Sequence, residues 1–564
     1  MNYQTSEQHK DISTSRQSRD AEDTLKILGL LESQDPFAGY DHLQHLMTGV
    51  TAHDSVNVDK SKEVGSHVLT DMVGKNVMTY TFKRKAHAVT MDSKSAVKIG
   101  KEEVVSIDPQ LLFQRLVIAG SQADKLAEAF GYELCGYPPA LFESKTVLLS
   151  ANKPQIAKSI WNAVPHDDSP EGDILYVLDG GALLHRLPWQ TGKTYTSILD
   201  SYCSYVSRHY GPSVIIVFDG YTNQPSTKDG THTRRNKTVG RNVSFTSAMP
   251  LKMKKQEFLS NNDNKQRFIN MLSECLERTG FQVHNADGDA DVLIAQTAVM
   301  AAKKHRTVLV GDDTDLLILL LHLYQCGELY FMSEPRKSSS SSSHKYLNIG
   351  RACGILAQDV TSNILFTHAI LGCDTTSRVF GVGKSVSLRL VQESPIFREQ
   401  ASVFRKVSAT KDEIIAAGEK AMGLLCKGGV TDSLNELRLK RFHAQVTDNK
   451  TAIHPRNLPP TSSSTKFHSL RVYHQVQEWM GNSLPPEEWG WRIQDGHFIP
   501  IHSDQDPAPQ FLLELVRCKC KSGCSTMRCP CRHQGLDCTL ACLECRGACA
   551  NMCSHHQDDS EDIE

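Results

Sequence analysis

Short runs of β-branched and other apolar residues alternate with segments of helix length from residue 173 onward. Four such runs, DILYVLD, SVIIVFDG, FQVHNAD and TVLVGDD, are separated by stretches such as YTSILDSYCSYVSRH and DADVLIAQTAVMAAKK. This alternation is typical of a parallel sheet, because the crossover helices cover both of its faces and leave its strands continuously apolar. The sequence therefore predicts an α/β domain over residues 170–395, with a mostly parallel central sheet and flanking helices.

The predicted strands end in aspartate. The residues concerned are Asp179, Asp219, Asp313 and Asp315, and Asp287, Asp289 and Asp291 come just after the fourth strand-like run and at a helix start. Because the carboxyl ends of parallel strands share one edge of a sheet, we expect these side chains to converge on one crevice. A single member such as Asp289 has an alternative role as a helix N-cap, and Asp312 as a solvated turn residue. The arrival of the set at four strand ends favours a common site.

Carboxylates held close together repel one another, and burial adds to the cost of ionising them. A cation must therefore neutralise such a site. Ligands that are all oxygen, with no histidine or cysteine among them, suit hard divalent ions such as Mg²⁺ or Mn²⁺. Two such ions about 3.5–4 Å apart are the usual apparatus for in-line displacement at a phosphodiester. The residue types alone therefore predict a metal-dependent phosphodiesterase.

Five segments occur in an order that resembles the PIN-like flap endonuclease superfamily of structure-specific nucleases. They are ILYVLDGGALL, VIIVFDGY, NADGDADVLIAQTA, VLVGDDTDLLIL and HAILGCDTTSRVFGVGKS, and they span about residues 173–390. The resemblance implies a PIN-like fold, a flapped or otherwise structured DNA substrate and two Mg²⁺ or Mn²⁺ ions. It assigns catalytic and metal-binding roles to Asp179, Asp219, Asp289, Asp291, Asp313, Asp315 and Asp374. Asp289 and Asp291 stand where that family usually has a Glu-x-Glu pair.

The segment FGVGKS ends the last of these matches. A phosphate-binding P-loop would need a glycine five residues before Gly383, and Arg378 stands there. The segment is similar to the helix-hairpin-helix of the same superfamily, which implies that Gly381 and Gly383 let the backbone approach a DNA phosphate and that Lys384 adds charge at a helix start. An ordinary glycine-rich turn is the alternative.

A basic segment follows the second predicted strand. Residues 228–255 contain eight Lys or Arg and one acid. The resemblance places here a basic arch that threads single-stranded nucleic acid, and it makes Arg234, Arg235 and Lys237 the candidates for phosphate contact. A solvated basic loop is the alternative.

The 564-residue chain has a net charge of −2. Whole-molecule attraction to nucleic acid is thereby excluded, so any such binding depends on local basic patches. The sequence has no uncharged apolar stretch of about 18 residues, and its first residues lack the pattern of a secretory signal. We expect a protein that is not secreted and does not bind membranes, located in the nucleus, with the cytoplasm as the alternative.

Ten of the 17 cysteines lie between positions 518 and 553. They are Cys518, Cys520, Cys524, Cys529, Cys531, Cys538, Cys542, Cys545, Cys549 and Cys553. Disulfides do not persist in a reducing compartment, whereas thiolates one to four residues apart suit tetrahedral Zn²⁺. A segment this short also needs metal to fold. The sequence therefore predicts more than one structural zinc ion.

The cysteine spacing resembles the tesmin-type CXC domain, whose nine cysteines hold a zinc cluster and which binds DNA. The resemblance implies a module over residues 516–555 that makes non-specific phosphate contacts through Lys519, Lys521, Arg528 and Arg532. A purely structural or protein-binding zinc module is the alternative.

The remaining boundaries come from composition. Around the nuclease-like domain we expect disorder over 1–25, a mixed α/β region of unknown role over 26–165, a helical extension over 396–450, a linker and small aromatic-rich region over 451–515 and an acidic disordered tail over 556–564. The whole predicts a metal-dependent nuclease that acts on DNA rather than RNA. The alternatives are a non-catalytic DNA- or chromatin-binding regulator and a nuclease derived from a mobile element.

Overall fold

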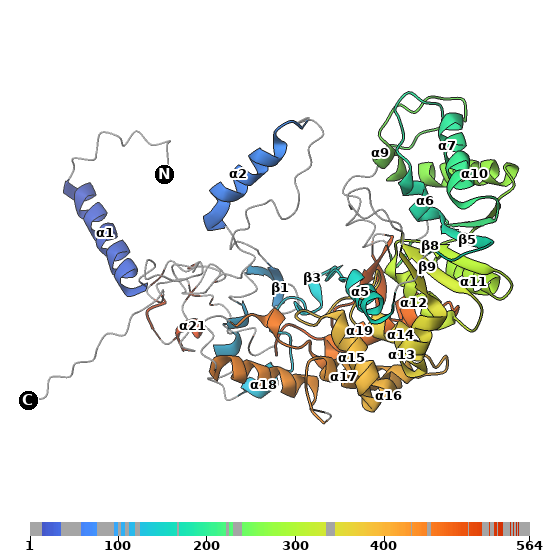
Figure 1. Cartoon of the computed structure of the whole chain (residues 1–564). Helices are drawn as coiled ribbons and strands as arrows, with labels where there is room; N and C mark the ends of the chain where they lie inside the picture. Colours follow the sequence, from blue (N-terminus) through green and yellow to red (C-terminus); the bar gives the residue numbers. More distant parts are fainter. Residues whose placement is uncertain are drawn as a thin grey trace, which may run out of the picture. The chain divides into compact units, whose positions relative to one another are not determined.

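The computed structural model divides the chain into two compact units, which are described separately (Figure 1). The first unit comprises residues 1–136, 438–458 and 505–564, and the second comprises residues 137–437 and 459–504. The structure describes residues 14–34, 58–75, 95–99, 103–107, 112–114, 116–118, 125–165, 169–221, 225–228, 240–333, 345–429, 431–447, 453–494, 496–509, 512, 518, 520, 524–526, 528–533, 538, 542, 545, 549 and 551.

A six-stranded sheet forms the centre of the second unit, in the order β10-β9-β8-β5-β6-β7. The strands are β5 (Ile174–Asp179), β6 (Val214–Phe218), β7 (Gln282–Asn285), β8 (Arg306–Val310), β9 (Leu329–Ser333) and β10 (Lys345–Asn348). All neighbours are parallel except β9 and β10. Leu178 pairs with Ile216 on one side and Val310 on the other, so the strands end at a common edge. The predicted α/β fold with a mostly parallel sheet is confirmed.

The two faces of the sheet belong to different cores, because successive side chains of a strand point to opposite sides. One face contributes Val177, Ile215, Val217, Leu309 and Phe331. The other contributes Leu178, Val214, Ile216, Phe218, Val308 and Val310. Helices α6 (Gly180–Arg186), α7 (Tyr195–Tyr210), α9 (Lys255–Leu259) and α10 (Asn262–Arg278) cover the second face, and α5 (Pro154–Ala163), α11 (Asp291–Ala302), α12 (Thr314–Leu323) and α13 (Ile349–Leu356) cover the first.

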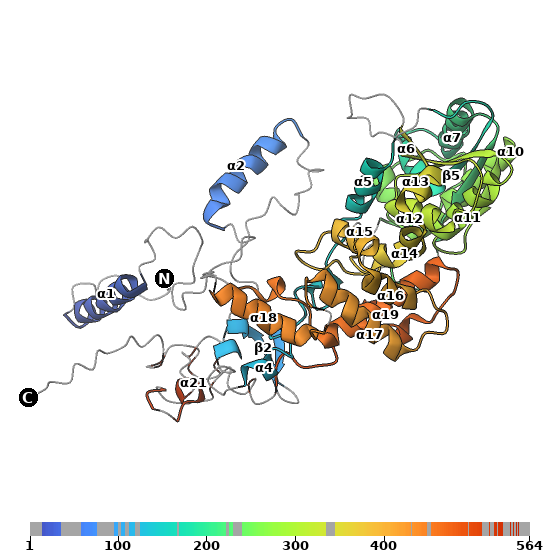
Figure 2. The same ribbon diagram turned by 60° about the horizontal axis from the view of Figure 1, so that its bottom comes forward.

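A group of packed helices continues the core of the first face (Figure 2). They are α14 (Gln358–Ala369), α15 (Lys384–Glu393), α16 (Pro395–Val403), α17 (Lys411–Leu425) and α19 (Ser462–Trp479). The smaller elements of this unit are β3 (Phe142–Ser144), β4 (Val147–Leu148), η5 (Pro486–Glu488), β11 (Trp491–Gln494) and β12 (His497–Pro500). The unit therefore extends beyond residues 170–395 at both ends.

Helix α19 lies where the sequence predicted a linker. The Thr461 hydroxyl accepts a hydrogen bond from the Ser464 amide at 3.3 Å and caps the helix. Further along the helix, Ser469 lies against Gly418 of α17, where a Cβ on the glycine would clash with it, so the two helices approach closely. The polar run is therefore the beginning of a buried helix.

The first unit contains α1 (Thr14–Gln34), η1 (Val58–Lys60), α2 (Ser61–Met72), the antiparallel pair β1 (Ser95–Ile99) and β2 (Glu103–Ile107), α4 (Leu126–Ala129), η4 (Pro455–Asn457) and α21 (Pro530–His533). Helix α18 (Leu434–Thr447) contributes residues from 438 onward. Helix α1 includes part of the segment for which we expected disorder. None of the helices in the described ranges has the length and apolar character needed to cross a bilayer.

The core of the first unit is formed by residues far apart in the sequence. The rings of Phe113, Phe130 and Phe442 contact one another. The buried guanidinium of Arg438 lies 3.5 Å from the Glu133 carboxylate and donates to the Glu133 carbonyl at 3.1 Å. Cysteines of the C-terminal segment belong to the same apolar cluster. Residues between 112 and 134 therefore share one core with the C-terminal cysteines.

Candidate active site

Asp179 is the last residue of β5 and the N-cap of α6. Its carboxylate accepts hydrogen bonds from the amides of Gly181 at 2.8 Å and Ala182 at 3.2 Å. A Cβ placed on Gly181 would lie 3.1 Å from Asp179 Oδ1 and 3.4 Å from Asp219 Oδ2, so both carboxylates flank this glycine. The predicted convergence of the first two strand ends is thus present.

Asp219 follows β6 and is fixed by two donors. The amide of Ala290 donates to it at 3.0 Å, and the hydroxyl of Tyr221 donates at 3.0 Å. The ammonium of Lys265 donates in turn to the Tyr221 hydroxyl and lies 3.7 Å from the centre of its ring. Asp219 is therefore held at the strand end by a hydrogen-bonded chain that ends in a cation.

A second group of carboxylates surrounds Lys153. The oxygens of Asp313, Asp315 and Asp374 lie within 4.8 Å of one another. Lys153 Nζ lies 2.8 Å from Asp315, 2.9 Å from Asp374 and 3.7 Å from Asp313. Asp313 also caps α12 by accepting from the Asp315 amide at 3.0 Å. Three carboxylates of the predicted site therefore share one ammonium.

A third group forms around Lys228. Lys228 Nζ lies 2.6 Å from Asp289 and 3.3 Å from Asp291. Asp291 begins α11, where the helix dipole favours negative charge. The seven predicted aspartates thus lie in three subgroups, and lysines contact the members of two of them.

A buried chain of polar groups lies behind Asp315. His368 Nε2 lies 2.8 Å from Asp315 Oδ1, and Lys384 Nζ lies 2.9 Å from His368 Nδ1 and donates to the His368 carbonyl at 2.7 Å. Burial, with Lys384 nearby, lowers the pKa of His368 to about 4, so the ring is neutral. The Asp315 carboxylate can only accept, so Nε2–H of the neutral ring donates to Asp315 and Nδ1 accepts from Lys384.

This placement bears on the role expected for Lys384. Its side chain is 2 % exposed, which leaves its ammonium facing His368 and argues against direct phosphate contact. The backbone of the segment does have the expected turn: Gly381 has a φ of 74°, and Gly383 is the N-cap of α15. Phosphate contact by these two glycines stays a prediction.

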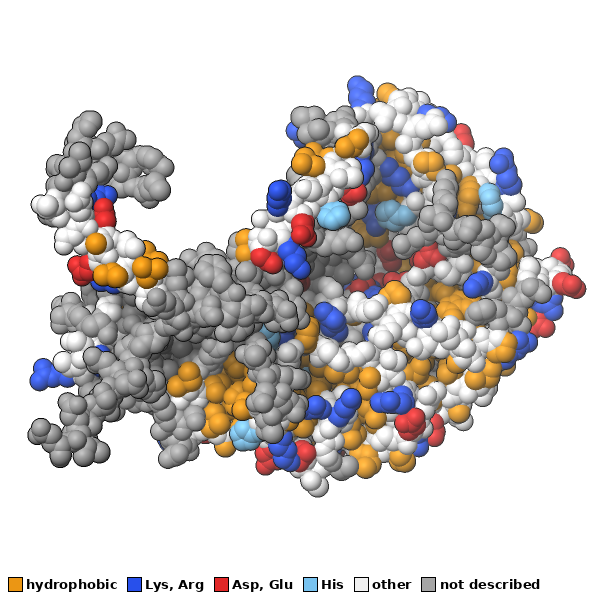
Figure 3. Space-filling model, turned by 60° about the vertical axis from the view of Figure 1, so that its left-hand side comes forward, with side chains coloured by type: hydrophobic (Ala, Val, Ile, Leu, Met, Phe, Trp, Pro, Cys, Tyr) orange, Lys and Arg blue, Asp and Glu red, His pale blue; other side chains and the backbone are white. Residues whose placement is uncertain are grey.

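The electrostatics of the cluster are uneven. Burial raises the pKa of the Asp179 carboxyl to about 7, and the carboxylates of Asp219 and Asp313 add to the rise. Burial and Asp315 raise the pKa of Asp313 as well. Burial alone would raise the pKa of Asp315, but Lys153 and His368 outweigh it and hold that pKa below its usual range. The carboxylates around Asp179 are therefore less well neutralised than Asp315, which has Lys153 beside it. Figure 3 shows acidic side chains gathered in a hollow, with basic and histidine side chains around them.

The raised pKa of Asp179 predicts a pH-dependent stability. Because the folded pKa of about 7 exceeds the ordinary 3.8, the ionised carboxyl destabilises the fold above pH 7, and this cost disappears as the pH falls toward 4. Three pKa units correspond to about 4 kcal/mol. Without divalent ions, Asp179→Asn should therefore be more stable than the wild type at pH 8, by up to about that amount, and the difference should shrink at pH 5.5.

Urea unfolding followed by tryptophan fluorescence measures this difference, because all five tryptophans lie in the second unit. Equal stabilities of the two proteins at pH 8 would contradict the raised pKa.

The residues present fit a divalent cation. Ionised carboxylates supply oxygen ligands, and those of Asp313, Asp315 and Asp374 are already close enough to share one ion. Asp179 and Asp219 offer a second position, with an excess of negative charge that a cation would relieve. Both positions match the oxygen-only donor set that the sequence predicts.

Sequence reasoning missed the cations of the site. Lys153 lies in the region to which we assigned no function, and no motif surrounds it. Lys228 was counted only within the basic segment, and His368 only within a motif. Lys265 lies near the start of α10, in a segment to which we assigned no element or motif. Arg234, Arg235 and Lys237 lie outside the described residues, so their phosphate contacts stay predictions.

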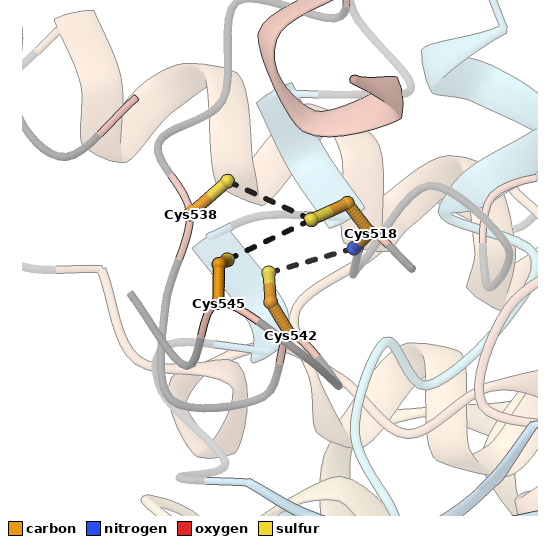
Figure 4. A group of neighbouring side chains, drawn as sticks. All are labelled: Cys518, Cys538, Cys542 and Cys545. Carbon is orange, nitrogen blue, oxygen red and sulfur yellow. Dashed lines mark hydrogen bonds between the residues drawn. The ribbon is translucent and has the colours of Figure 1, made fainter. Parts of the chain in front are cut away.

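The C-terminal cysteines form a separate cluster in the first unit (Figure 4). Cys518 Sγ lies 3.7 Å from Cys524 Sγ, 3.8 Å from Cys538 Sγ and 3.7 Å from Cys545 Sγ. Four sulfurs at about 2.3 Å from a tetrahedral zinc ion are about 3.8 Å apart. Disulfide-bonded sulfurs would be about 2.05 Å apart. The spacing therefore fits zinc thiolates.

Among the cysteines that the structure describes, three groups of four could each hold a metal ion. They are Cys518, Cys538, Cys542 and Cys545; Cys518, Cys524, Cys529 and Cys538; and Cys524, Cys538, Cys545 and Cys549. Cys538 belongs to all three, so the groups form one cluster with shared sulfurs. Cys531 Sγ lies 3.7 Å from Cys542 Sγ, and Cys520 is half-buried. Cys553, Lys519 and Lys521 lie outside the described residues, whereas Arg528 is exposed. The identity of the metal stays a prediction.

A family model matches the N-terminal residues of the chain. Residues 1–133 match a family described as "Domain of unknown function (DUF8702)". No curated protein matches the chain. Solved structures that resemble it include the catalytic core of Rad2 in complex with DNA substrate, with 14% identity, a TM-score of 0.31 and coverage of 57% of this chain and 85% of that one.

Two further structures are similar at the same level. T5 5′-exonuclease with bound zinc ions is 13% identical, with a TM-score of 0.28 and coverage of 55% of this chain and 99% of that one. The eukaryotic junction-resolving enzyme GEN-1 is 14% identical, with a TM-score of 0.27 and coverage of 59% and 70%. These TM-scores are too low to transfer the activity of those enzymes to this protein.

Proposed function

We propose that this protein is a metal-dependent nuclease that hydrolyses phosphodiester bonds in structured DNA. The observation that carries the proposal is the convergence of seven aspartates, whose charge exceeds that of the lysines that contact them. Asp315 is buried, five others are partly buried and Asp289 is exposed. A buried excess of carboxylate is unstable without a cation, and Mg²⁺ or Mn²⁺ is the cation that oxygen ligands select. DNA as the substrate makes the nucleus the proposed location.

Asp179, Asp219 and Lys228 can each be assigned a role in this function. Asp179 and Asp219 are fixed by backbone amides at the ends of β5 and β6, so they would present oxygens to an ion without rearrangement. A bound divalent ion supplies a water-derived hydroxide and stabilises charge on the leaving oxygen. Lys228, whose Nζ contacts Asp289 and Asp291, carries its ammonium on a four-carbon side chain with rotatable bonds and is the candidate for contact with a substrate phosphate.

A second candidate function has one observation in its favour. Lys153 and Lys228 together contact five of the seven aspartates within 4.0 Å. If these ion pairs are permanent, the fold would serve as a nucleic-acid-binding scaffold without chemistry. Such a protein would bind DNA and no divalent ion.

Cleavage assays distinguish the two functions. The zinc-loaded full chain should cut flapped, hairpin or single-stranded DNA with Mn²⁺ or Mg²⁺, and the double variant Asp313→Ala/Asp315→Ala should not. RNA of the same shapes tests the preference for DNA. Binding without cleavage on every substrate, together with no Mn²⁺ uptake, would establish the non-catalytic alternative.

A further inference from the structure

The three subgroups of aspartates differ in their direct contacts with lysine among the described residues. Lys153 lies among Asp313, Asp315 and Asp374. Among the described residues, no lysine or arginine nitrogen lies within 4.0 Å of the carboxylate of Asp179 or Asp219. The two positions that a pair of divalent ions would take therefore differ: one already contains a cation from the chain.

Lys153 is held in this position by its helix. It is the N-cap of α5, with Pro154 as the first residue of the helix, and the buried Ile156 and Ile160 anchor that helix in the core. Its side chain is 13% exposed. Gln155 of the same turn accepts a hydrogen bond from the Lys384 amide at 3.0 Å, which ties the start of α5 to α15. The ammonium is therefore built into the site by the fold.

The principal partner of Lys153 has little capacity left for a metal ion. Lys153 Nζ lies 2.8 Å from Asp315 Oδ2, and His368 Nε2–H donates to Oδ1 at 2.8 Å. Both oxygens of this buried carboxylate are thus engaged by donors of the chain. A divalent ion would have to displace the ammonium from the same oxygens or accept strong repulsion from it at a few ångströms.

We propose that Lys153 is a built-in counter-ion that replaces one of the two divalent ions expected at such a site, so that the site takes a single ion at Asp179 and Asp219. The proposal rests on the proposed metal-dependent function. Lys228 differs, because residues 225–228 lie outside any helix or strand, and its Nζ lies beside Asp289 and Asp291.

Counting bound Mn²⁺ by electron paramagnetic resonance tests the proposal without an activity assay. The zinc-loaded full chain should bind one tight Mn²⁺, and Lys153→Met should bind two. Lys158→Met is the matched control, because Lys158 is exposed on the same helix, and it should bind one. Asp179→Asn should lose the ion of the wild type.

The number of bound ions distinguishes a failure of the role proposed for Lys153 from a failure of the proposed metal-dependent function. Two ions in the wild type, or one in both the wild type and Lys153→Met, would overturn the role of Lys153 and leave a metal-dependent nuclease standing. No ion in either protein would overturn the proposed function itself.

A second variant tests whether the result for Lys153→Met comes from misfolding. Lys153→Met leaves three carboxylates without their ammonium, whereas Lys153→Met/Asp374→Asn removes one charge of each sign. The double variant should keep the tryptophan fluorescence of the folded unit without Mn²⁺, and it should bind the second ion at least about tenfold more weakly than Lys153→Met, because a ligand is missing. Equal affinity for the second ion in both variants would place that ion away from Asp374 and overturn the proposal.

Discussion

Asp179→Asn is expected to reduce metal-dependent cleavage by about a thousandfold or more while the second unit stays folded. The metal ion is expected to supply several kcal/mol of transition-state stabilisation, and each 1.36 kcal/mol corresponds to about a tenfold change in rate. Asparagine keeps an oxygen that can accept from the amides of Gly181 and Ala182, so the cap of α6 survives. What it loses is the negative charge that holds a cation.

The matched control lies at the other end of the same strand. Asp173 is exposed and directly precedes β5, and Asp173→Asn should cut at the wild-type rate. Single-turnover assays with saturating Mn²⁺ on the best substrate of the screen measure the difference. Wild-type cleavage by Asp179→Asn would mean that the chemistry lies elsewhere in the chain.

The sequence predicted the acids of this site because the fold itself creates their pattern. A parallel strand buried on both faces must be apolar throughout and must end where the chain reaches water, so the aspartates after ILYVL, VIIVF and TVLV mark both a strand end and a shared edge. Asp374 follows no strand and was found only through the resemblance.

The cations could not be predicted in this way. Lys153 reaches Asp315 across 162 positions of sequence, from a helix outside every recognised motif. The neutral His368 depends on burial and on Lys384, which are properties of packing rather than of pattern. Helix α19 was missed for a related reason, because its burial depends on packing: Ser464 and Ser469 are buried, and Ser469 lies against Gly418 of another helix. Local composition identifies a strand end, but it does not reveal which distant side chain will neutralise it.

Cys538→Ser is expected to unfold the C-terminal cysteine cluster and to open the core of the first unit. Cys538 is the cysteine that all three groups of potential metal ligands share. Zinc contributes on the order of 10 kcal/mol to folding in small zinc domains, which is comparable to the whole stability of a typical domain. Loss of the shared ligand should therefore release zinc and remove the cluster as a folded element.

The effect should spread to residues near position 130, because the cysteines and the N-terminal residues form one apolar cluster. Cys518 and Cys538 pack in the same core as Phe113 and Phe130. The Leu134 amide donates to the Pro507 carbonyl at 2.8 Å. Hydrogen exchange at residues 125–134 should consequently accelerate in Cys538→Ser, although the substitution lies about 400 positions away in the sequence.

A control variant and a second measurement show whether the effect is confined to the first unit. Cys326 is an exposed thiol of the second unit, and Cys326→Ser should change neither zinc content nor exchange. Tryptophan fluorescence should be the same in both variants, because every tryptophan lies in the second unit. If exchange at residues 125–134 stays slow after zinc is lost, the N-terminal residues fold without the cysteine cluster, and the tail is a separable module, as the CXC resemblance implied. If exchange accelerates, zinc at the end of the chain is a structural requirement of its beginning, and removing residues 510–564 would damage the region that matches the domain of unknown function.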